Sequence, residues 1–291
     1  MTTTVQTRPL ISIRASATAQ EAARLMADCR ISAVGVLDED DRFYGIVTER
    51  DLAWFVAQGK ESATPVEKIA ADFPALVEGP IDDDVALERM RSARVRHLIV
   101  RAGMDYHIAS MHDYFPSTEG PASTPTVRDA MSAPAIACRE DAYFEEIAEL
   151  LAERDLSGLP VVDEQGVVVG VVSERDLAYV LGGPMVRLAL RRHNGESLPV
   201  AADLPREARI ARNIMTSPAL TVPVDTPLDE VACLMRTHQV NRLPVVDHRQ
   251  LVGVVTRGDV LDVIGHLDHQ PVDVSDPPVL VGHPSAPSVS W

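Results

Sequence analysis

One heptapeptide recurs through this chain and restricts what the chain can fold into. The sequence GVVSERD at residues 170–176 returns as GIVTERD at residues 45–51 and as GVVTRGD at residues 253–259, and an eroded copy, HIASMHD, occupies residues 107–113. Each copy places Ser or Thr after an apolar pair and an Asp three residues later. The pattern predicts a buried strand that runs into a helix, with the hydroxyl residue at the N-cap and the Asp in the first turn. Such a cluster at a helix N-terminus can hold a polar ligand.

The copies belong to longer repeats. Each is preceded by a helix-like segment, an apolar strand and a turn, and the apolar strands lie at residues 34–37, 98–100, 159–162 and 243–246. The order predicts four β-α-β-β-α repeats and a mixed α/β (α+β) fold class. A repeat of about 50–60 residues can bury only a thin core, which is a physical reason for repeats to pack in pairs.

The spacing of the repeats predicts the domain organisation. The final aspartates of the four copies are about 62, 63 and 83 residues apart, so the last step holds an insertion, at residues 183–209. Within it, residues 185–192 have a basic amphipathic pattern that either extends the preceding helix or binds a partner. We therefore expect a first module at 9–115 (repeats 9–60 and 66–115), a linker at 116–125, a second module at 126–264 (repeats 126–182 and 210–264) and a flexible tail at 265–291.

Composition limits the partners and the compartment. A net charge of −16 argues against nucleic acid, no apolar run approaches the ~20 residues of a membrane helix, and the first residues lack the apolar core of a secretion signal. Cys29, Cys138 and Cys233 lie in apolar patterns without CxxC spacing, which favours buried free thiols in a reducing cytoplasm. We find no metal-ligand spacing of histidines, phosphate loop or nucleophile elbow, and expect neither a metal site nor an enzyme.

Three pairs of motifs carry a resemblance to a known family: LPVVD at residues 159–163 and 243–247, the heptapeptides at 170–176 and 253–259, and the lead-ins DAMS at 129–132 and NIMT at 213–216. Over about residues 9–264 the repeats resemble cystathionine-beta-synthase (CBS) domains, which pair into Bateman modules. The resemblance implies that two repeats pack sheet to sheet about a pseudo-two-fold axis. Four repeats also resemble the gamma regulatory subunit of AMP-activated protein kinase, in which two modules close into a disc. Two copies of this chain could form similar discs, and we expect a homodimer.

The resemblance implies an adenosine-nucleotide site at each heptapeptide. In the family the Asp accepts hydrogen bonds from both ribose hydroxyls and the Ser or Thr contacts sugar or phosphate, and an acceptor-only carboxylate does match a diol. These roles transfer to four pairs, Thr48–Asp51, Ser110–Asp113, Ser173–Asp176 and Thr256–Asp259. The alternative is that the pairs only cap helices. We also expect that loss of Asp259 would leave the helix cap to the adjacent hydroxyl.

Further site residues follow from the resemblance. Residues before the second strand of a repeat would hold phosphate, which implies Asn241–Arg242 and Arg96–His97; the alternative for Arg242 is a solvated surface side chain. The implied base pocket is backbone and apolar, and the alternative for its residues is core packing. Its residues are Ile136, Ala137, Leu156 and Ser157 for the fourth repeat and Leu220, Thr221 and Val240 for the third. The second repeat departs most from the family, because His107 replaces a glycine and Ile99 a proline.

These observations predict a cytoplasmic, stand-alone regulatory protein that binds an adenosine nucleotide (AMP, ADP or ATP), has no catalytic cofactor and acts on an unidentified effector. The second module, with both heptapeptides intact and Arg242 present, should bind more tightly than the first. The alternative is a scaffolding protein whose modules assemble without a ligand. An enzyme contained in the insertion and the tail is disfavoured by their short lengths.

Overall fold

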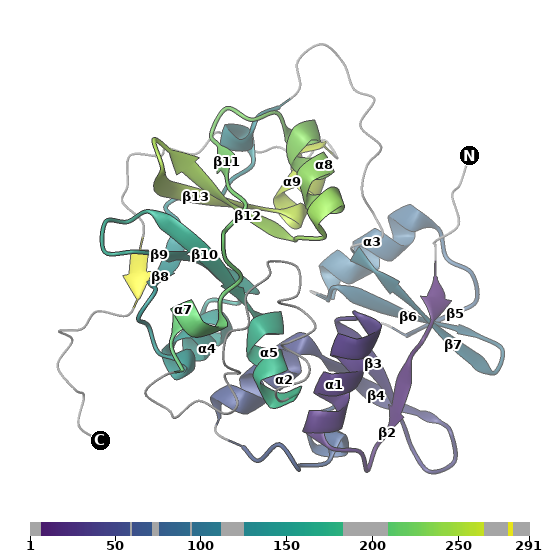
Figure 1. Ribbon diagram of the computed structural model, residues 1–291. Coiled ribbons are helices and arrows are strands. Elements are labelled where there is room, and N and C mark those ends of the chain that lie inside the picture. Colours follow the sequence, from purple (N-terminus) through teal and green to yellow (C-terminus); the bar gives the residue numbers. More distant parts are fainter. Residues whose placement is uncertain are drawn as a thin grey trace. The chain divides into compact units, whose positions relative to one another are not determined.

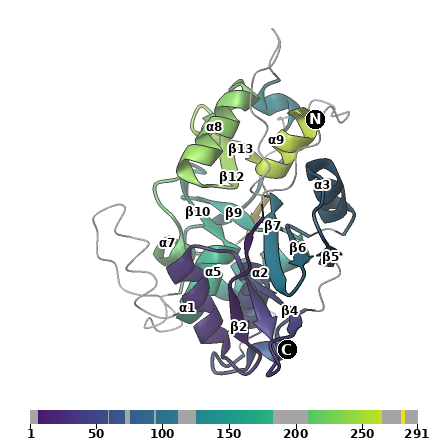
Figure 2. The same cartoon turned by 90° about the vertical axis from the view of Figure 1, so that its right-hand side faces the viewer.

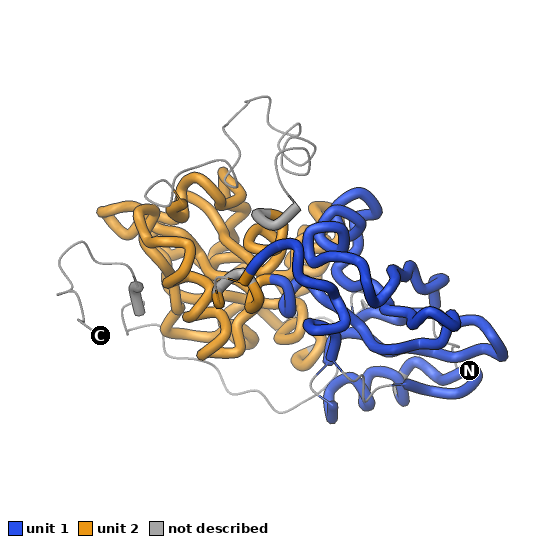
Figure 3. The backbone as a smooth tube through the Cα atoms, turned by 90° about the horizontal axis from the view of Figure 1, so that it is seen from below, with its two compact units in different colours: residues 1–52, 61–116 blue, residues 53–60, 117–291 orange. Residues whose placement is uncertain are grey.

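The computed structural model of the protein describes residues 7–58, 60–71, 76–93, 95–111, 125–182, 209–264 and 279–281. The chain divides into two compact units (Figure 3): unit 1 contains Met1–Leu52 and Glu61–Pro116, and unit 2 contains Ala53–Lys60 and Ser117–Trp291. Asp113, the predicted linker before Pro125 and the predicted insertion before Arg209 lie outside the described residues.

Unit 1 has two small sheets, each with a hairpin and a parallel strand, and the second sheet has the further antiparallel strand β1 (Arg8–Pro9). The first sheet is ordered β2-β3-β4, and its elements follow one another as β2 (Ser12–Arg14), α1 (Ala19–Cys29), β3 (Ala33–Leu37) and β4 (Phe43–Thr48). Helix α2 (Glu49–Ala57) follows β4, and its residues from Ala53 on are counted with unit 2. The second sheet, ordered β1-β7-β6-β5, contains β1, β5 (Leu76–Glu78), β6 (His97–Ala102) and β7 (Asp105–Ser110). The 3-10 helix η1 (Val66–Lys68) precedes β5, and helix α3 (Asp83–Ser92) connects β5 to β6.

Unit 2 repeats this plan. One sheet, ordered β10-β9-β8-β14, contains β8 (Ile136–Arg139), β9 (Gly158–Val162), β10 (Val168–Ser173) and β14 (Val279–Val281). The 3-10 helix η3 (Val127–Asp129) precedes β8, helix α4 (Phe144–Glu153) connects β8 to β9, and helix α5 (Glu174–Gly182) follows β10. The other sheet, ordered β11-β12-β13, contains β11 (Val222–Pro223), β12 (Arg242–Asp247) and β13 (Gln250–Thr256). Helix α7 (Ala211–Ile214) precedes β11, helix α8 (Leu228–His238) connects β11 to β12, and helix α9 (Arg257–Ile264) follows β13. Helices α8 and α9 pack against each other beside this sheet (Figures 1 and 2).

The order of elements confirms the predicted fold class. All four segments run strand, helix, strand, strand, and the closing helix is described in three of them, as α2, α5 and α9. Helix α1 shows how local sequence starts a helix. Thr18 and Glu21 form a capping box, in which the Glu21 N–H donates to Thr18 Oγ1 at 3.2 Å and the Thr18 N–H donates to Glu21 Oε2 at 2.7 Å. Ala22 and Met26 on its inner face are fully buried, and Leu25 is half-buried.

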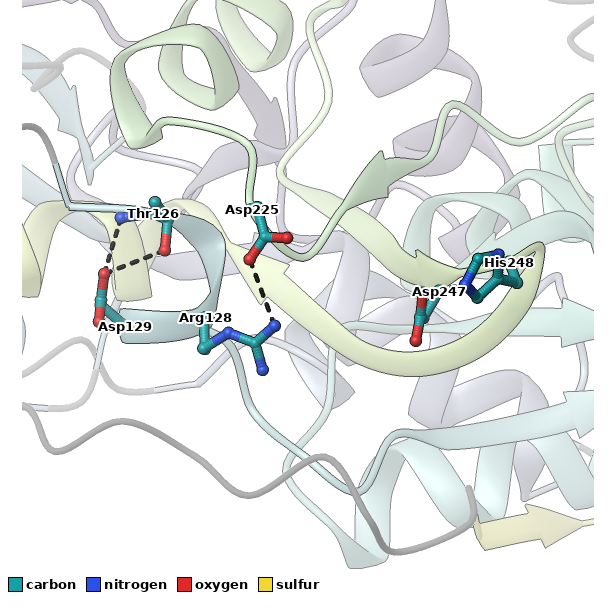
Figure 4. Close-up of polar contacts among 6 residues, drawn as sticks. All are labelled: Thr126, Arg128, Asp129, Asp225, Asp247 and His248. Atoms are coloured by element: carbon teal, nitrogen blue, oxygen red, sulfur yellow. Dashed lines mark hydrogen bonds and ion pairs between the residues drawn. The ribbon is translucent and has the colours of Figure 1, made fainter.

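In unit 2, each repeat is completed by the segment that precedes the other repeat. From here on, the name lead-in refers to the whole segments 125–135 and 209–221, which precede β8 and β11 and contain the motifs DAMS and NIMT. The first donates from Val127 N–H to Thr226 O at 2.9 Å and from Ser132 N–H to Val254 O at 2.9 Å. An ion pair of 3.2 Å joins Arg128 to Asp225 beside the Thr126–Asp129 capping box (Figure 4).

The second lead-in reaches back in the same way. The Phe144 N–H donates to Arg209 O at 2.8 Å, and Thr216 and Val171 exchange two backbone bonds of 2.8 and 3.0 Å. The exchange is therefore reciprocal, and two repeats share one set of backbone hydrogen bonds.

Unit 1 has its own version of this exchange. The Ala19 N–H donates to Thr64 O at 2.9 Å, and the residues after η1 bridge to β4 through Ala71 and Ile46. In return β1, which precedes the first repeat, pairs antiparallel with β7, with Pro9 opposite His107.

The exchange explains the glycine of the recurrent heptapeptide. A Cβ atom added at Gly253 would lie 2.9 Å from Ser132 O and from Met131 Sδ, both in the lead-in that crosses over it. Gly170 meets Met215 and Thr216 in the same way. At the equivalent position of the second repeat the crossing segment is the strand β1, which pairs with β7 as a normal ladder, and such a ladder has room for the His107 side chain.

One expectation from the sequence is wrong. Cys138 is buried, and burial raises the pKa of its thiol to about 12, but Cys29 and Cys233 are exposed; all three are free thiols. Within the predicted flexible tail, Val279–Val281 forms the strand β14, parallel to β8. None of the helices in the described ranges is long and apolar enough to cross a membrane.

Candidate functional site

Each intact heptapeptide joins a strand directly to a helix. The hydroxyl ends the strand and donates to Oδ2 of the Asp, at 2.6 Å in Thr48–Asp51 and at 2.7 Å in both Ser173–Asp176 and Thr256–Asp259. The backbone N–H of the hydroxyl residue donates to the same oxygen at 2.7–2.8 Å. The structure thus contains three copies of one polar constellation at three helix N-termini, where the helix dipole favours negative charge.

The same contacts make each Asp a part of its helix cap. The Asp259 N–H donates back to Thr256 Oγ1 at 3.3 Å, and Asp51 donates to Thr48 Oγ1 at the same distance. This is a capping box with Asp at the usual place of Glu. Loss of Asp259 would leave the hydroxyl half of the cap, because the backbone N–H of residue 259 could still donate to Thr256 Oγ1, but the Thr256 N–H would lose its acceptor. A carboxylate has about four acceptor positions, so capping leaves capacity for a ligand.

The ladder places the predicted phosphate residues beside these caps. Arg242, the first residue of β12, stands directly opposite Thr256 at the end of β13. The Arg257 N–H, which starts α9, donates to Asn241 O at 2.9 Å. The third repeat has the same arrangement: Gly158 stands opposite Ser173, and Ser157 O accepts from the N–H at the start of α5 at 3.1 Å.

Arg242 also crosses from the fourth repeat to the third. Its Nη1 donates to Gly158 O at 2.8 Å, and its Nη2 donates to Ser157 Oγ. A Cβ atom at Gly158 would come within 3.1 Å of the guanidinium carbon, so the absence of a side chain at Gly158 leaves room for the guanidinium. Arg242 is half-buried in this position. It is thus not the solvated side chain of the alternative interpretation, because it binds the repeat opposite its own.

His97 holds the equivalent position in unit 1, and Ser32 that of Ser157. His97 Nε2 lies 2.9 Å from Ser32 Oγ. His97 is only 7% exposed, and burial, followed by the charges of Arg96 and Arg8, lowers its pKa from 6.5 to about 3. The imidazole is therefore neutral at neutral pH and lacks the charge with which a phosphate would be held.

The residues predicted for the base pocket lie in or beside the core of unit 2. Ala137 is fully buried and packs with Leu251 of β13, while Leu156 packs on the core around Leu159. The Val240 N–H donates to Met235 O at 3.0 Å, next to the end of α8. Ile136, Leu220, Thr221 and Asn241 are half-buried.

Thr216 is a further candidate that sequence reasoning used only as part of a lead-in motif. Its Oγ1 lies 3.5 Å from Asp176 Oδ1, so the second lead-in brings a hydroxyl from the fourth repeat to the third repeat's carboxylate. The recurrence of Met-Thr and Met-Ser in the two lead-ins was the available signal. The recurrence alone did not indicate that Thr216 lies beside Asp176, because that contact depends on the crossing of the second lead-in to the third repeat.

The fourth copy of the constellation is described only in part. Ser110 ends β7 opposite His97 and is buried, and its predicted partner Asp113 lies outside the described residues. A cavity of about 470 Å³ in unit 1 is lined by Leu10, Ser12, Asp41 and Tyr106 among others, and none of the hydroxyl–Asp pairs lines it. In the part of the chain that is described, no group of three or more His, Cys, Asp or Glu residues is arranged to hold a metal ion.

Comparison with solved structures supports the fold. Protein MJ1225 from Methanocaldococcus jannaschii, described as a candidate archaeal homologue of g-AMPK, superposes with a TM-score of 0.73, covers 89% of this chain and 98% of its own, and is 19% identical.

Curated relatives match about half of the chain. YlbB from Bacillus subtilis, an uncharacterised protein, is 33% identical over 135 residues, which are 46% of this chain and 78% of YlbB. The L-aspartate semialdehyde sulfurtransferase of Methanocaldococcus jannaschii is 29% identical over 140 residues, which are 48% of this chain but only 23% of that enzyme.

The sequence profile of one family covers more than half of the chain. The profile, described as the CBS domain, matches residues 3–57, 127–183 and 211–266. These stretches contain the three intact heptapeptides, the sheets β2-β3-β4 and β11-β12-β13, and the strands β8, β9 and β10. The chain therefore belongs to the CBS domain family.

Proposed function

We propose that the protein is a regulatory protein that binds an adenosine nucleotide of the AMP, ADP or ATP type and passes its ligand state to an effector protein. The observation that carries the proposal is the ladder position of Arg242 opposite Thr256. Arg242 and the hydroxyl–carboxylate pair Thr256–Asp259 thus belong to the same end of the β12–β13 hairpin, and this supports a single site that uses both. The carboxylate matches a ribose diol and the guanidinium matches phosphate oxygens, as family membership suggests.

The proposed organisation is four repeats in two modules, residues 9–115 and 126–264. Residues 76–110 run strand, helix, strand, strand like the other repeats, and this supports counting them as a fourth, diverged copy although the family profile does not match them. We further propose a homodimer in the cytoplasm. The three free thiols fit a reducing compartment.

The two modules should differ in affinity. Unit 2 holds two complete constellations, the Arg242 guanidinium and the added hydroxyl of Thr216. In unit 1 the neutral His97 holds the position that Arg242 holds in unit 2, so the charge available for phosphate would have to come from the preceding residue, Arg96. Asn241, Ser157, Thr221, Val240, Leu156 and Ala137 would form the walls of the sites in unit 2, and we propose that these sites bind first.

One observation favours a second candidate function. The capping boxes give Asp51, Asp176 and Asp259 a structural role without any ligand. A scaffolding protein whose modules assemble without nucleotide would need nothing more.

Calorimetry of the full chain with AMP and 2′-deoxy-AMP separates these functions. The two nucleotides share base and phosphate and differ only in the diol that the carboxylate would read. We expect AMP to bind at least 10-fold more tightly, since the analogue leaves a charged acceptor without its partner. At 100 times its dissociation constant, AMP should also add about 2.7 kcal/mol to stability in a thermal shift assay. Absence of binding by AMP, ATP and S-adenosylmethionine alike would leave the scaffolding function.

A further inference from the structure

The C-terminal strand β14 closes one edge of β8. It runs parallel to β8, with Val279 opposite Ile136, Leu280 opposite Ala137 and Val281 opposite Cys138 (Figure 1). The opposite edge of β8 pairs with β9 only at Cys138 and Arg139. Without β14, one edge of β8 would present a row of unpaired backbone N–H and C=O groups over residues 136–138.

The sequence of β14 suits this position. Val279, Leu280 and Val281 are an apolar, mostly β-branched run bracketed by Pro277–Pro278 and Gly282. Prolines cannot donate to a ladder, so pairing can begin only after residue 278. The segment is therefore a short, bounded strand, suited to reversible addition to a sheet edge.

The middle residue of the edge that β14 covers contributes its side chain to the core of unit 2. Ala137 is fully buried and clusters with Leu251 of β13, the strand that ends at Thr256. The lead-in just before β8 also bonds to β13, through Ser132 and Val254. Ala137 thus packs with the hairpin that carries Arg242 and Thr256, and Thr256 in turn bonds to Asp259 in the first turn of α9.

We propose that residues 279–281 are an intramolecular competitor of the nucleotide base for the backbone of residues 136–138; this inference rests on the proposed function. The edge of an adenine ring carries hydrogen-bond donors and acceptors and is read by backbone groups as well as by side chains. β14 uses such groups of the same three residues. When the strand is docked, the base site of the fourth repeat is closed, and nucleotide binding requires its release.

The cost of release appears as a weaker apparent affinity. If the site is open for only a fraction of the time, the apparent dissociation constant is the intrinsic one divided by that fraction. A strand that is docked about 90% of the time would weaken binding roughly tenfold. A partner that takes up the tail would raise nucleotide affinity by the same factor, because coupling between two binding events is reciprocal.

The test uses the full chain with Leu280→Pro, which removes a backbone donor from the middle of β14, and Ser288→Pro as the matched control beyond the strand. Leu280→Pro should bind AMP about tenfold more tightly in calorimetry. In hydrogen exchange it should lose protection at amides of residues 136–138. Ser288→Pro should match the parent chain in both measurements. A chain that ends at residue 276 should reproduce Leu280→Pro.

The two measurements keep the failures apart. Faster exchange at residues 136–138 with unchanged AMP affinity would overturn the competition and leave the nucleotide function standing. Unchanged exchange would overturn the docking of β14. If none of the chains binds AMP, ATP or S-adenosylmethionine, the proposed function fails and the competition fails with it.

Discussion

Ser32 Oγ and His97 Nε2 lie 2.9 Å apart, and this contact joins the two repeats of unit 1 at the same positions at which Ser157 and Arg242 join the two repeats of unit 2. In both units a serine before the second strand of one repeat bonds to the first residue of the equivalent strand in the other. The joint is conserved in geometry within the molecule, while its chemistry differs. One joint is neutral and buried, and the other carries a charge beside a candidate phosphate site.

The neutral joint predicts a pH dependence for unit 1. The pKa of His97 falls from 6.5 in an unfolded chain to about 3 in the folded one, so the unfolded state binds the extra proton between these values. The stability that the neutral imidazole contributes is fully present above pH 6.5 and is lost as the pH falls toward 3. The unfolding equilibrium constant should rise up to tenfold per pH unit over this range. Urea unfolding of the parent chain and of His97→Gln, which cannot titrate, measures the difference.

The difference in midpoint between parent and His97→Gln should shrink steadily from pH 7 to pH 5. A difference that stays constant with pH would mean that His97 has the same pKa in the folded and the unfolded chain. Direct titration of the His97 imidazole by NMR would then place its pKa near 6.5.

The charged joint predicts that Arg242 affects both stability and ligand. Arg242→Ala removes the donors to Gly158 O and Ser157 Oγ, and we expect a loss of about 1–3 kcal/mol in urea unfolding. Its effect on affinity should increase from adenosine to AMP to ATP, because the guanidinium acts on phosphate charge. Arg242→Lys is the control, since it keeps the charge without the planar fork. Equal losses for adenosine and ATP would remove Arg242 from the phosphate site.

The capping boxes decide which substitution tests the ribose site. Asp259→Ala would remove the carboxylate half of the capping box together with the candidate site, whereas Asp259→Asn keeps an acceptor for the Thr256 N–H and removes the charge. We expect Asp259→Asn to change the melting temperature little and to weaken AMP by about 2–3 kcal/mol, which is roughly 30- to 150-fold. Asp129→Asn is the matched control, because Asp129 caps Thr126 through the same two contacts, at 2.8 and 3.0 Å, away from the heptapeptides.

Calorimetry and thermal unfolding of both variants give the answer. If Asp259→Asn and Asp129→Asn alter AMP affinity equally, Asp259 is a capping residue and nothing more. Asp51→Asn should have a smaller effect on AMP than Asp259→Asn if unit 2 binds first.

The crossing of the lead-ins predicts the effect of a single methyl group. Gly253→Ala would place Cβ 2.9 Å from Ser132 O. This backbone oxygen can move away only if the bridge between Ser132 and Val254 is distorted or broken. We expect a loss of about 1–3 kcal/mol in urea unfolding. Gly258→Ala is the control, since its Cβ would meet only Thr256 Oγ1, at 3.5 Å, and a helix favours alanine over glycine. Equal stability of the two variants would show that the lead-in does not lie tightly on β13.

The sequence predicted what depends on local order and period. The hydroxyl and Asp spacing predicted the helix starts, and the recurrence predicted the sheets. It did not predict that Arg242 bonds across to Ser157, because a register locates a residue along a strand but not the direction of its long side chain. Cys29 shows the same limit: a helical period gives the side of α1 on which a residue lies, but not how far the neighbouring sheet extends beneath its last turn. β14 was missed because three apolar residues among prolines give no period at all.

The reciprocal lead-ins give each pair of repeats the connectivity of a domain-swapped dimer whose two halves have been joined into one polypeptide. A pair of repeats is therefore the smallest segment that contains both halves of the exchange. Duplication of a gene segment that spans one repeat would yield a strand-and-helix body with its completing segment on the wrong partner, and it would be free to exchange with another copy of itself. A segment that spans two repeats carries both halves of the exchange and can be copied without this risk. An even number of repeats is therefore the number that such a chain accumulates most readily.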